Sequence, residues 1–320
     1  LAVETCRRER AATPFAKIGL LCFNRHLGAH LTDVAAREGL TTVRAGSFYA
    51  HIDQVLGDVS DAAATDPAYF RARVQRATEV AQAWPLEAKF DLLVIDEGQD
   101  LRDDASKLAF MDAILKGGLK DGRWWWFEDL DQILSPEESV LPSAAGQALF
   151  ALLDDAPEAV VERNWRNTEQ IARAAAKVMG RPAHEGSGIS GPAVTTAAYQ
   201  PGKELATLEA MLTHVVLHQQ GPEDIVVLSV RGAGKECYAG QATLAGLRLV
   251  PFDPSRPYVP GTLRTSTVFK FKGMESYAVV LADLDSLATE RDRRKAYVGI
   301  SRAKYALYIL AAPAAEQALR

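Results

Sequence analysis

A group of acidic residues follows one of the most apolar segments of the chain. In FDLLVIDEGQD, residues 90–100, the run LLVI leads into Asp96 and Glu97. Open parallel α/β sheets bind ligands beyond the carboxyl ends of their strands, so these carboxylates lie where a phosphate-bound metal ion would lie. An aspartate there can hold Mg²⁺, and an adjacent glutamate can orient or deprotonate the water that attacks a γ-phosphate. The structural alternative is a polar loop that caps a helix.

Three further residues suit the same phosphate chemistry. Gln132 follows the aromatic segment RWWWFED, where its amide could sense a γ-phosphate. Arg166 lies where a predicted strand meets a helix, and Arg302 ends a helix that leads into a strand. Two arginines on separate elements can neutralise charge on a transferring phosphoryl group, although each could also be a solvated helix cap. In FKGMES, Gly273 would let the backbone approach a ligand, and Glu275 could accept from a ribose hydroxyl.

Alternating strand and helix patterns must position these residues. Short apolar, branched or aromatic segments are typical of buried strands; they are KIGLLCF, FDLLVID, RWWWFED, EAVVE, AVTTAAY, DIVVLSV, LRLVPF, YAVVLADL and YALYILA. Helical patterns separate them, including RHLGAHLTDVAAREG, PAYFRARVQRATEVAQAW, TEQIARAAAKVMG and GKELATLEAMLTHVVLHQQG. This alternation predicts two α/β domains with mainly parallel sheets, residues 1–155 and 156–320.

The composition is that of a soluble globular protein. Of 320 residues, 48% are hydrophobic and 24% are charged, which is enough to build one large core or two ordinary ones. No apolar run approaches the roughly 20 residues of a membrane span, and LAVETCRRER lacks the order of a signal peptide. We therefore expect no membrane association and a cytoplasmic location, with three reduced cysteines. The net charge of -5 disfavours non-specific coating of nucleic acid but allows a locally basic groove.

Two glycine-containing segments imitate nucleotide-binding motifs. GSGISGP, residues 186–192, satisfies G-x-G-x-x-G, but no predicted strand precedes it, so we interpret it as a linker. VRGAGKE, residues 230–236, would need glycine in place of Ser229 and a hydroxyl in place of Glu236 to be a phosphate loop. An ordinary turn between strand and helix is the better interpretation.

Taken in order, seven segments resemble the helicase motifs of superfamily 1, in its UvrD/Rep branch. They are LLCFNRHLGAHL, TVRAGSFYAHI, VIDEGQD, FEDLDQIL, NWRNTEQIA, STVFKFKGMES and YVGISRAKYALYIL. The resemblance spans nearly the whole chain. It implies two RecA-like domains of the P-loop NTPase type that bind ATP in the cleft between them and move along a single strand of nucleic acid.

The resemblance also implies a role for each matching residue. Asp96 is expected to bind Mg²⁺, Glu97 to be the catalytic base and Gln132 to sense the γ-phosphate. Arg166 and Arg302 are expected to contact phosphates, and Gly273 and Glu275 to bind the nucleotide, with Glu275 on the ribose. Gln99 and Asp100 are expected to couple this site to the neighbouring motifs. Residues matching nucleic-acid-contacting positions are Phe23, Asn24, Ser47, Phe48, Thr267 and Lys270. Because aromatic residues are commonly buried, core packing of Phe23 or Phe48 is a fair alternative.

The departures from the family pattern are informative. No G-x-x-x-x-G-K-[ST] loop occurs in the chain, and its first residues resemble the segment that comes after that loop in the family. We therefore expect a first domain truncated at its N-terminus, a portion of a longer protein, and no ATP hydrolysis by these residues alone; a degenerate, non-hydrolysing relative is the alternative. SPEESVLP follows Gln132 and Ile133 in place of a base-stacking motif, and the short spacing from Arg166 to Thr267 excludes a large insertion. Such compact forms resemble helicase parts that are joined to a nuclease-type domain.

The favoured function is a nucleic-acid-dependent ATPase motor that uses ATP and Mg²⁺. The resemblance implies 3′ to 5′ movement on single-stranded DNA, with RNA as an open alternative. A second hypothesis is a nucleotide-dependent clamp that binds nucleic acid without unwinding it. A small-molecule kinase on a similar fold is less favoured, because it does not explain the motifs of the second domain.

Overall fold

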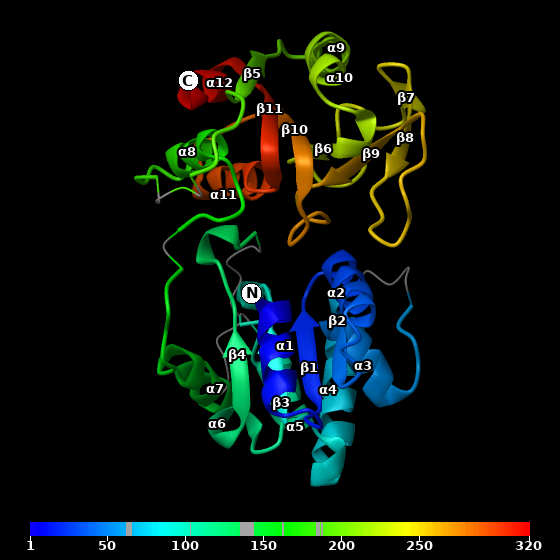
Figure 1. Cartoon of the computed structure of the whole chain (residues 1–320), viewed down its shortest axis with the longest axis vertical. Coiled ribbons are helices and arrows are strands. Elements are labelled where there is room, and N and C mark those ends of the chain that lie inside the picture. The colour runs from blue at the N-terminus through cyan, green and yellow to red at the C-terminus, as the bar shows by residue number, and fades with distance from the viewer. Residues whose placement is uncertain (62–65, 103, 135–143, 162, 184–185, 187) are drawn as a thin grey trace. The chain divides into compact units, whose positions relative to one another are not determined.

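The chain folds into two compact units. The computed structural model describes residues 1–61, 66–102, 104–134, 144–161, 163–183, 186 and 188–320. The units are Leu1–Glu158 and Ala159–Arg320, and each is described by itself (Figure 1). The division falls three residues after the predicted domain boundary at residue 155.

The first unit is built on a four-stranded parallel sheet with strand order β2-β1-β3-β4. Its strands are β1 (Ile18–Cys22), β2 (Val43–Ser47), β3 (Leu92–Ile95) and β4 (Arg123–Trp126). Its helices are α1 (Ala2–Ala12), α2 (Arg25–Arg37), α3 (Phe48–Leu56), α4 (Pro67–Gln82), α5 (Ala105–Ile114), α6 (Gly118–Asp121) and α7 (Ala144–Asp154). Three short 3-10 helices complete it: η1 (Leu86–Ala88), η2 (Gly98–Asp100) and η3 (Leu130–Gln132).

Local sequence signals fix these elements. Every residue of β1 and β3 is buried, as expected for central strands covered on both faces. Asn24 caps α2 by accepting from the backbone N–H groups of His26 and Leu27, and Ser47 caps α3 by accepting from Ala50. Ser47 is the last residue of β2 and Asn24 lies two residues beyond β1, so the polar residues where these strands end are also helix starts.

The second unit is built on a seven-stranded sheet with strand order β5-β11-β10-β6-β9-β8-β7. Its strands are β5 (Thr195–Ala198), β6 (Ile225–Ser229), β7 (Thr243–Leu244), β8 (Leu247–Pro251), β9 (Thr262–Thr267), β10 (Ser276–Leu284) and β11 (Ala303–Ala311). Its helices are α8 (Glu169–Val178), α9 (Glu204–Met211), α10 (Leu217–Gln219), α11 (Glu290–Ile300) and α12 (Pro313–Leu319), with a π-helical turn η4 (Leu212–Val216) and a 3-10 helix η5 (Pro222–Asp224). All neighbouring strands are parallel except β7 and β8.

Long central strands organise the core of the second unit. β10 and β11 pair in parallel, and Val280 lies opposite Tyr308. Their alternate residues pack against Leu208 and Leu212 of α9 and η4, whereas α8 and α11 lie side by side and contact β11 (Figure 1). The loops at the amino ends of β10 and β11 are therefore held on a rigid base.

The predicted fold class is confirmed, since both units are α/β with mainly parallel sheets. One predicted strand is wrong: EAVVE, residues 158–162, forms no strand over its described residues, and Val160 and Val161 are 71% and 60% exposed. An apolar run predicts a strand only where a neighbouring strand is available to pair with it. The long helix predicted for residues 202–221 is interrupted by η4. In the part of the chain that the structure describes, no helix is long and apolar enough to cross a membrane.

Candidate nucleotide site and nucleic-acid interface

The acidic loop after β3 is anchored to the neighbouring strand. The backbone N–H of Asp96 donates to the carbonyl of Leu21, at 2.8 Å, so the loop continues the pairing of β3 with β1. Glu97 then adopts a left-handed backbone conformation with φ of 55°. This conformation costs a residue with a side chain about 1–2 kcal/mol, and such strain is often found at functional sites.

Gly98 allows this loop to approach β4 closely. A Cβ atom at this position would lie 2.2 Å from Nε1 of Trp126, which is closer than any side chain allows. The backbone N–H of Gly98 donates to the carbonyl of Phe127, at 2.8 Å. The glycine therefore holds the acidic loop against the end of β4.

A chain of hydrogen bonds connects the predicted base to the predicted γ-phosphate sensor. Gln99 Nε2 donates to Glu97 Oε2 at 2.7 Å, and Gln99 Oε1 accepts from the backbone N–H of Asp129 at 3.2 Å. Gln132 Nε2 donates to Asp129 Oδ2 at 2.8 Å. Gln99 is only 2% exposed, so its amide cannot easily exchange these partners for water. The coupling role expected of Gln99 thus has a direct physical basis.

Negative charge accumulates where β1 and β3 end. The Cys22 thiol lies there, and its burial first, then the charges of Asp96, Glu97 and Asp100, raise its pKa well above the ordinary value. A divalent cation at Asp96 would relieve this repulsion. Among the described residues no group of three or more His, Cys, Asp and Glu side chains could hold a metal ion. A single aspartate nevertheless fits Mg²⁺, which commonly binds one or two carboxylates with phosphate oxygens and water.

In the second unit the structure brings together three charged residues. Glu275 precedes β10, and its carboxylate lies 3.5 Å from Nε of Arg166 and 2.9 Å from Nζ of Lys304. Arg166 and Glu275 were predicted from the sequence, whereas Lys304 was not. All three side chains are partly exposed, so the group is accessible to a ligand.

Asn167 fixes the geometry of this group. It is buried, and its Nδ2 donates to the carbonyls of Ser301 and Ala303, at 3.1 and 2.5 Å. The backbone N–H of Thr168 donates to the carbonyl of Lys304, at 3.2 Å. The segment that carries Arg166 is therefore fastened to the start of β11.

Arg302 is located differently from Arg166. Its side chain is 0% exposed, and its guanidinium donates to the carbonyls of Val298 and Met274, at 3.0 and 3.3 Å, and to Ser301 Oγ. A buried cation needs such partners to offset its lost hydration. In this arrangement Arg302 supports the turn before Glu275 instead of facing a ligand, so a phosphate contact would require it to change partners. Gly273 in that turn has φ of 80°, which favours glycine.

The predicted nucleic-acid contacts of the first unit divide into two kinds. Phe48 follows the alternative of core packing: it is 0% exposed and packs edge-to-face on Phe110. Phe23 is partly buried and tilted against Tyr49, with Nζ of Lys107 4.7 Å from its ring centre. Asn24 and Ser47 are helix caps, so their side-chain oxygens already serve the backbone.

In the second unit, Thr267 and Lys270 follow the carboxyl end of β9. Thr267 is buried, and its Oγ1 accepts from the backbone N–H of Lys270 at 3.3 Å. The Lys270 side chain is exposed. Of this pair, Lys270 is the better candidate for a phosphate contact, and Thr267 shapes the turn that presents it. The segment SPEESVLP, predicted to lack a base-stacking motif, lies outside the described residues.

Sequence reasoning missed Trp165 and Asn167, the two residues on either side of Arg166. Trp165 is 66% exposed, and the guanidinium of Arg163 lies 4.7 Å from its ring centre. An exposed aromatic ring next to a candidate phosphate ligand can stack a base, and the sequence NWRN contained that signal. No sequence pattern indicated the role of Asn167, because that role depends on the carbonyls of Ser301 and Ala303, which are distant in the sequence.

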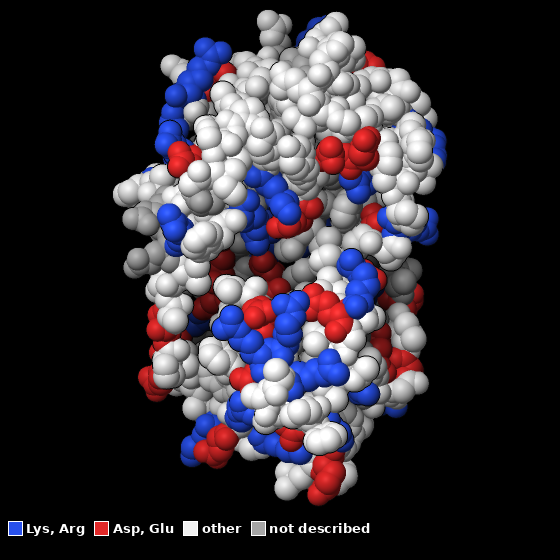
Figure 2. Space-filling view, in the orientation of Figure 1, with Lys and Arg blue, Asp and Glu red and all other residues white. Residues whose placement is uncertain are grey.

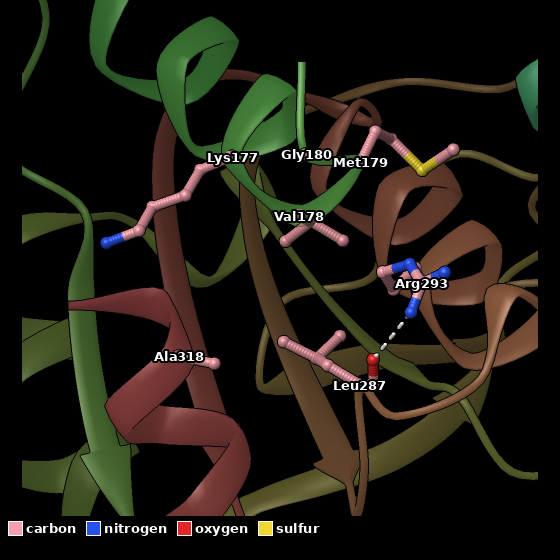
Figure 3. Close-up of a pocket in the computed structure, with 7 residues that line it drawn as sticks. All are labelled: Lys177, Val178, Met179, Gly180, Leu287, Arg293 and Ala318. Atoms are coloured by element: carbon pink, nitrogen blue, oxygen red, sulfur yellow. Dashed lines mark hydrogen bonds between the residues drawn. The ribbon is translucent and has the colours of Figure 1, made fainter.

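A pocket in the second unit is a different feature. It has a volume of about 390 Å³ and is lined by Lys177, Val178, Met179, Gly180, Leu287, Arg293 and Ala318 (Figure 3). Its two cations already serve backbone carbonyls: Lys177 Nζ donates to Leu319 and Arg293 Nη1 to Leu287, each at 3.2 Å. None of the predicted site residues lines it.

Surface charge gives no uniform basic face in the view of Figure 2, where acidic side chains interrupt the basic ones on both units. The arginines of α1 illustrate this. Arg7 pairs with Glu4 and Glu38, and Arg8 pairs with Glu4. On the face shown in Figure 2, a nucleic-acid contact would have to use small groups of basic side chains.

The loops before β10 and β11 lie in the part of the chain that matches a known family. Residues 262–310 match the family described as the UvrD-like helicase C-terminal domain, and the match includes Thr267, Lys270, Glu275 and Arg302. This match supports the resemblance predicted from the sequence over its last two motifs, STVFKFKGMES and YVGISRAKYALYIL. A search of curated proteins gave no match.

One similar solved structure is the C-terminal domain of a possible DNA helicase from Lactobacillus plantarum WCFS1. It is 16% identical, with a TM-score of 0.36, over 48% of this chain and 91% of that chain. At this level the likeness adds nothing to the family match.

Proposed function

We propose that the chain is the motor part of a nucleic-acid-dependent ATPase of the UvrD-like helicases. The observation that supports this best is the hydrogen-bonded chain from Glu97 through Gln99 and Asp129 to Gln132. This chain joins the proposed catalytic base to the proposed γ-phosphate sensor through a buried amide. The UvrD-like match of residues 262–310 gives independent support for a helicase-related function.

In this proposal each residue of the acidic loop has a separate task. Glu97 orients the attacking water and accepts its proton, and Gln99 holds the Glu97 carboxylate in position. Asp96 would hold Mg²⁺, which neutralises charge on the phosphates. Gln132 sits at the other end of the hydrogen-bonded chain, so a contact between its amide and a phosphate would be transmitted to Glu97.

The second unit has cationic groups of its own that could contact a phosphate. Arg166 is partly exposed and lies beside Glu275, so it can contact a phosphate while Glu275 accepts from the ribose. Arg302 would first have to leave Val298 and Met274. This exchange of partners could couple hydrolysis to movement, because Met274 belongs to the turn that carries Glu275.

The proposed partner is single-stranded DNA, and 3′ to 5′ movement is inferred from the resemblance. Phe23 and Lys270 are the candidate contacts, one by stacking and one by charge. RNA is the alternative strand, and it is distinguished by comparing oligonucleotides of the same sequence.

ATP hydrolysis with and without an oligo-dT strand tests the proposal. We would measure it on the full-length protein beside its Glu97→Gln variant. Stimulation by the strand that is lost in Glu97→Gln supports the motor. Equal rates in all samples contradict it.

The non-unwinding clamp is the second candidate, and the burial of Phe48 and Arg302 favours it. Both residues were predicted to contact ligands, yet both lie inside the unit to which they belong. A clamp would bind the strand with an affinity that depends on ATP, but it would not turn over faster when the strand is added. Anisotropy of a labelled oligo-dT, measured beside hydrolysis, separates the two functions.

A further inference from the structure

Two cations share the carboxylate of Glu275, although one is enough to balance its charge. Nζ of Lys304 lies 2.9 Å from Oε1, within hydrogen-bonding distance. Nε of Arg166 lies 3.5 Å from Oε2, which is an ion pair without a short hydrogen bond. Lys304 is thus the closer partner of Glu275, and Arg166 is the more loosely held one.

The backbone keeps the two cations on either side of Glu275. Asn167 and Thr168 fasten the segment of Arg166 to Ser301, Ala303 and Lys304. The backbone N–H of Ser276 donates to the carbonyl of Arg302, at 3.0 Å, which fixes the start of β10 to the same place. Three segments distant in the sequence therefore meet at one carboxylate.

We infer that Lys304 is a positioning residue that holds Glu275 for a ribose hydroxyl and leaves Arg166 able to turn to a phosphate. The inference rests on the proposed function, because it concerns the same nucleotide. If Arg166 were the sole partner of Glu275, its move to a phosphate would leave the carboxylate free to rotate away from the sugar. With Lys304 in place, the carboxylate keeps a charged donor throughout.

Stability is a weak explanation for this ion pair. Lys304 and Glu275 are 50% and 44% exposed at their side chains, and exposed pairs contribute about 0–1 kcal/mol. Removing Lys304 should therefore alter nucleotide recognition more than it alters folding.

The test is steady-state hydrolysis of ATP, 2′-deoxy-ATP and 3′-deoxy-ATP by the complete natural polypeptide with saturating oligo-dT. Lys304→Ala should raise the KM for ATP roughly threefold to tenfold, the value of one ordinary hydrogen bond at an exposed position, with little change in kcat. It should also reduce the preference for ATP over whichever deoxy analogue the unaltered protein discriminates against. Lys304→Arg should restore both, because it returns a charged donor.

Lys203→Ala is the matched control. Lys203 is also exposed, but it follows the carboxyl end of β5, whereas Lys304 lies at the amino end of the neighbouring parallel strand β11. It should leave KM and the sugar preference unchanged. Melting temperatures of all variants show whether folding is intact.

Three results would overturn the inference. An equal loss for ATP and both deoxy analogues would mean that Lys304 contacts phosphate. Unchanged kinetics in Lys304→Ala would mean that it has no role, and failure of Lys304→Arg to restore the preference would exclude the charged donor. If the unaltered protein neither binds nor hydrolyses ATP, the proposed function fails as well. This failure can be told from a failure of the inference about Lys304, because it is seen before any variant is measured.

Discussion

Gln99 donates a 2.7 Å hydrogen bond to the carboxylate of Glu97, the residue proposed to orient the attacking water. The bond links two residues that are close together in a strained turn, and the other end of the Gln99 amide is fixed by Asp129. The position of the proposed base therefore depends on a residue that has no chemical role of its own.

Replacing Gln99 with alanine should slow hydrolysis without unfolding the protein. The loss of a hydrogen bond to a charged group costs about 1.5–3 kcal/mol, so kcat should fall by roughly tenfold to a hundredfold. Gln75→Ala on α4 is the control, since Gln75 is exposed and its side chain donates to Glu79 of the same helix. A Gln99→Ala enzyme with normal kcat would show that the bond is structural.

Gly98→Ala should destabilise the first unit. The added methyl would meet the Trp126 indole at 2.2 Å, and overpacking of this kind costs about 1–3 kcal/mol. In urea unfolding, the double variant Gly98→Ala with Trp126→Ala should lose less stability than the sum of the single variants. Strict additivity would mean that the two residues do not restrict each other.

Asn167→Ala should affect both stability and nucleotide affinity. It leaves the buried carbonyls of Ser301 and Ala303 without this donor, which costs about 1–3 kcal/mol, and it releases the segment of Arg166. We expect a lower urea midpoint together with a higher KM for ATP. Arg173→Ala is a control on neighbouring α8, because its partner Glu169 is one helical turn away and partly exposed. A stability loss with unchanged KM would argue against the positioning of Arg166.

The two phenylalanines predicted to contact nucleic acid should behave differently. Phe48→Ala removes a fully buried ring and should cost about 3–5 kcal/mol of stability. Phe23→Ala should cost less stability but weaken binding of oligo-dT, as measured by anisotropy. Equal affinity of Phe23→Ala and the unaltered protein would remove Phe23 from the interface.

The raised pKa of Cys22 predicts a specific loss of stability in alkali. The Cys22 thiol stays protonated in the folded protein, whereas in the unfolded chain it ionises near its ordinary pKa of about 8.5. Its contribution to the free energy of unfolding is therefore complete below about pH 8.5 and is lost as the pH rises towards the folded pKa. Between about pH 8 and pH 10.5 the free energy of unfolding should therefore fall more steeply for the unaltered protein than for Cys22→Ala. If the free energy of unfolding fell with pH equally in both proteins, the raised pKa of Cys22 would be contradicted.

Most of the fold was predictable because its signals are local. The apolar segments that became β1, β3, β10 and β11 are uninterrupted and largely buried, and Asn24 and Ser47 start helices by an interaction within three residues. β9 was harder, because TLRTST carries an arginine and several hydroxyl residues. It is a strand because β6 and β8 pair with it on both sides.

The site was predictable in its residue types but not in its contacts. DEGQD located the acidic loop, yet the path from Gln99 to Asp129 joins residues that are 30 positions apart. Burial of the individual side chains was the hardest feature to predict. Phe48 and Arg302 match motif positions, but the sequence does not tell whether a matching side chain points inward.

The motor function is tested most directly by the rate of ATP hydrolysis of the complete natural polypeptide with and without oligo-dT, beside Glu97→Gln. A motor of this kind should show strong stimulation by the strand and lose it in the variant, with strand binding retained. Hydrolysis that ignores the strand, or a Glu97→Gln variant as active as the unaltered protein, would contradict the motor.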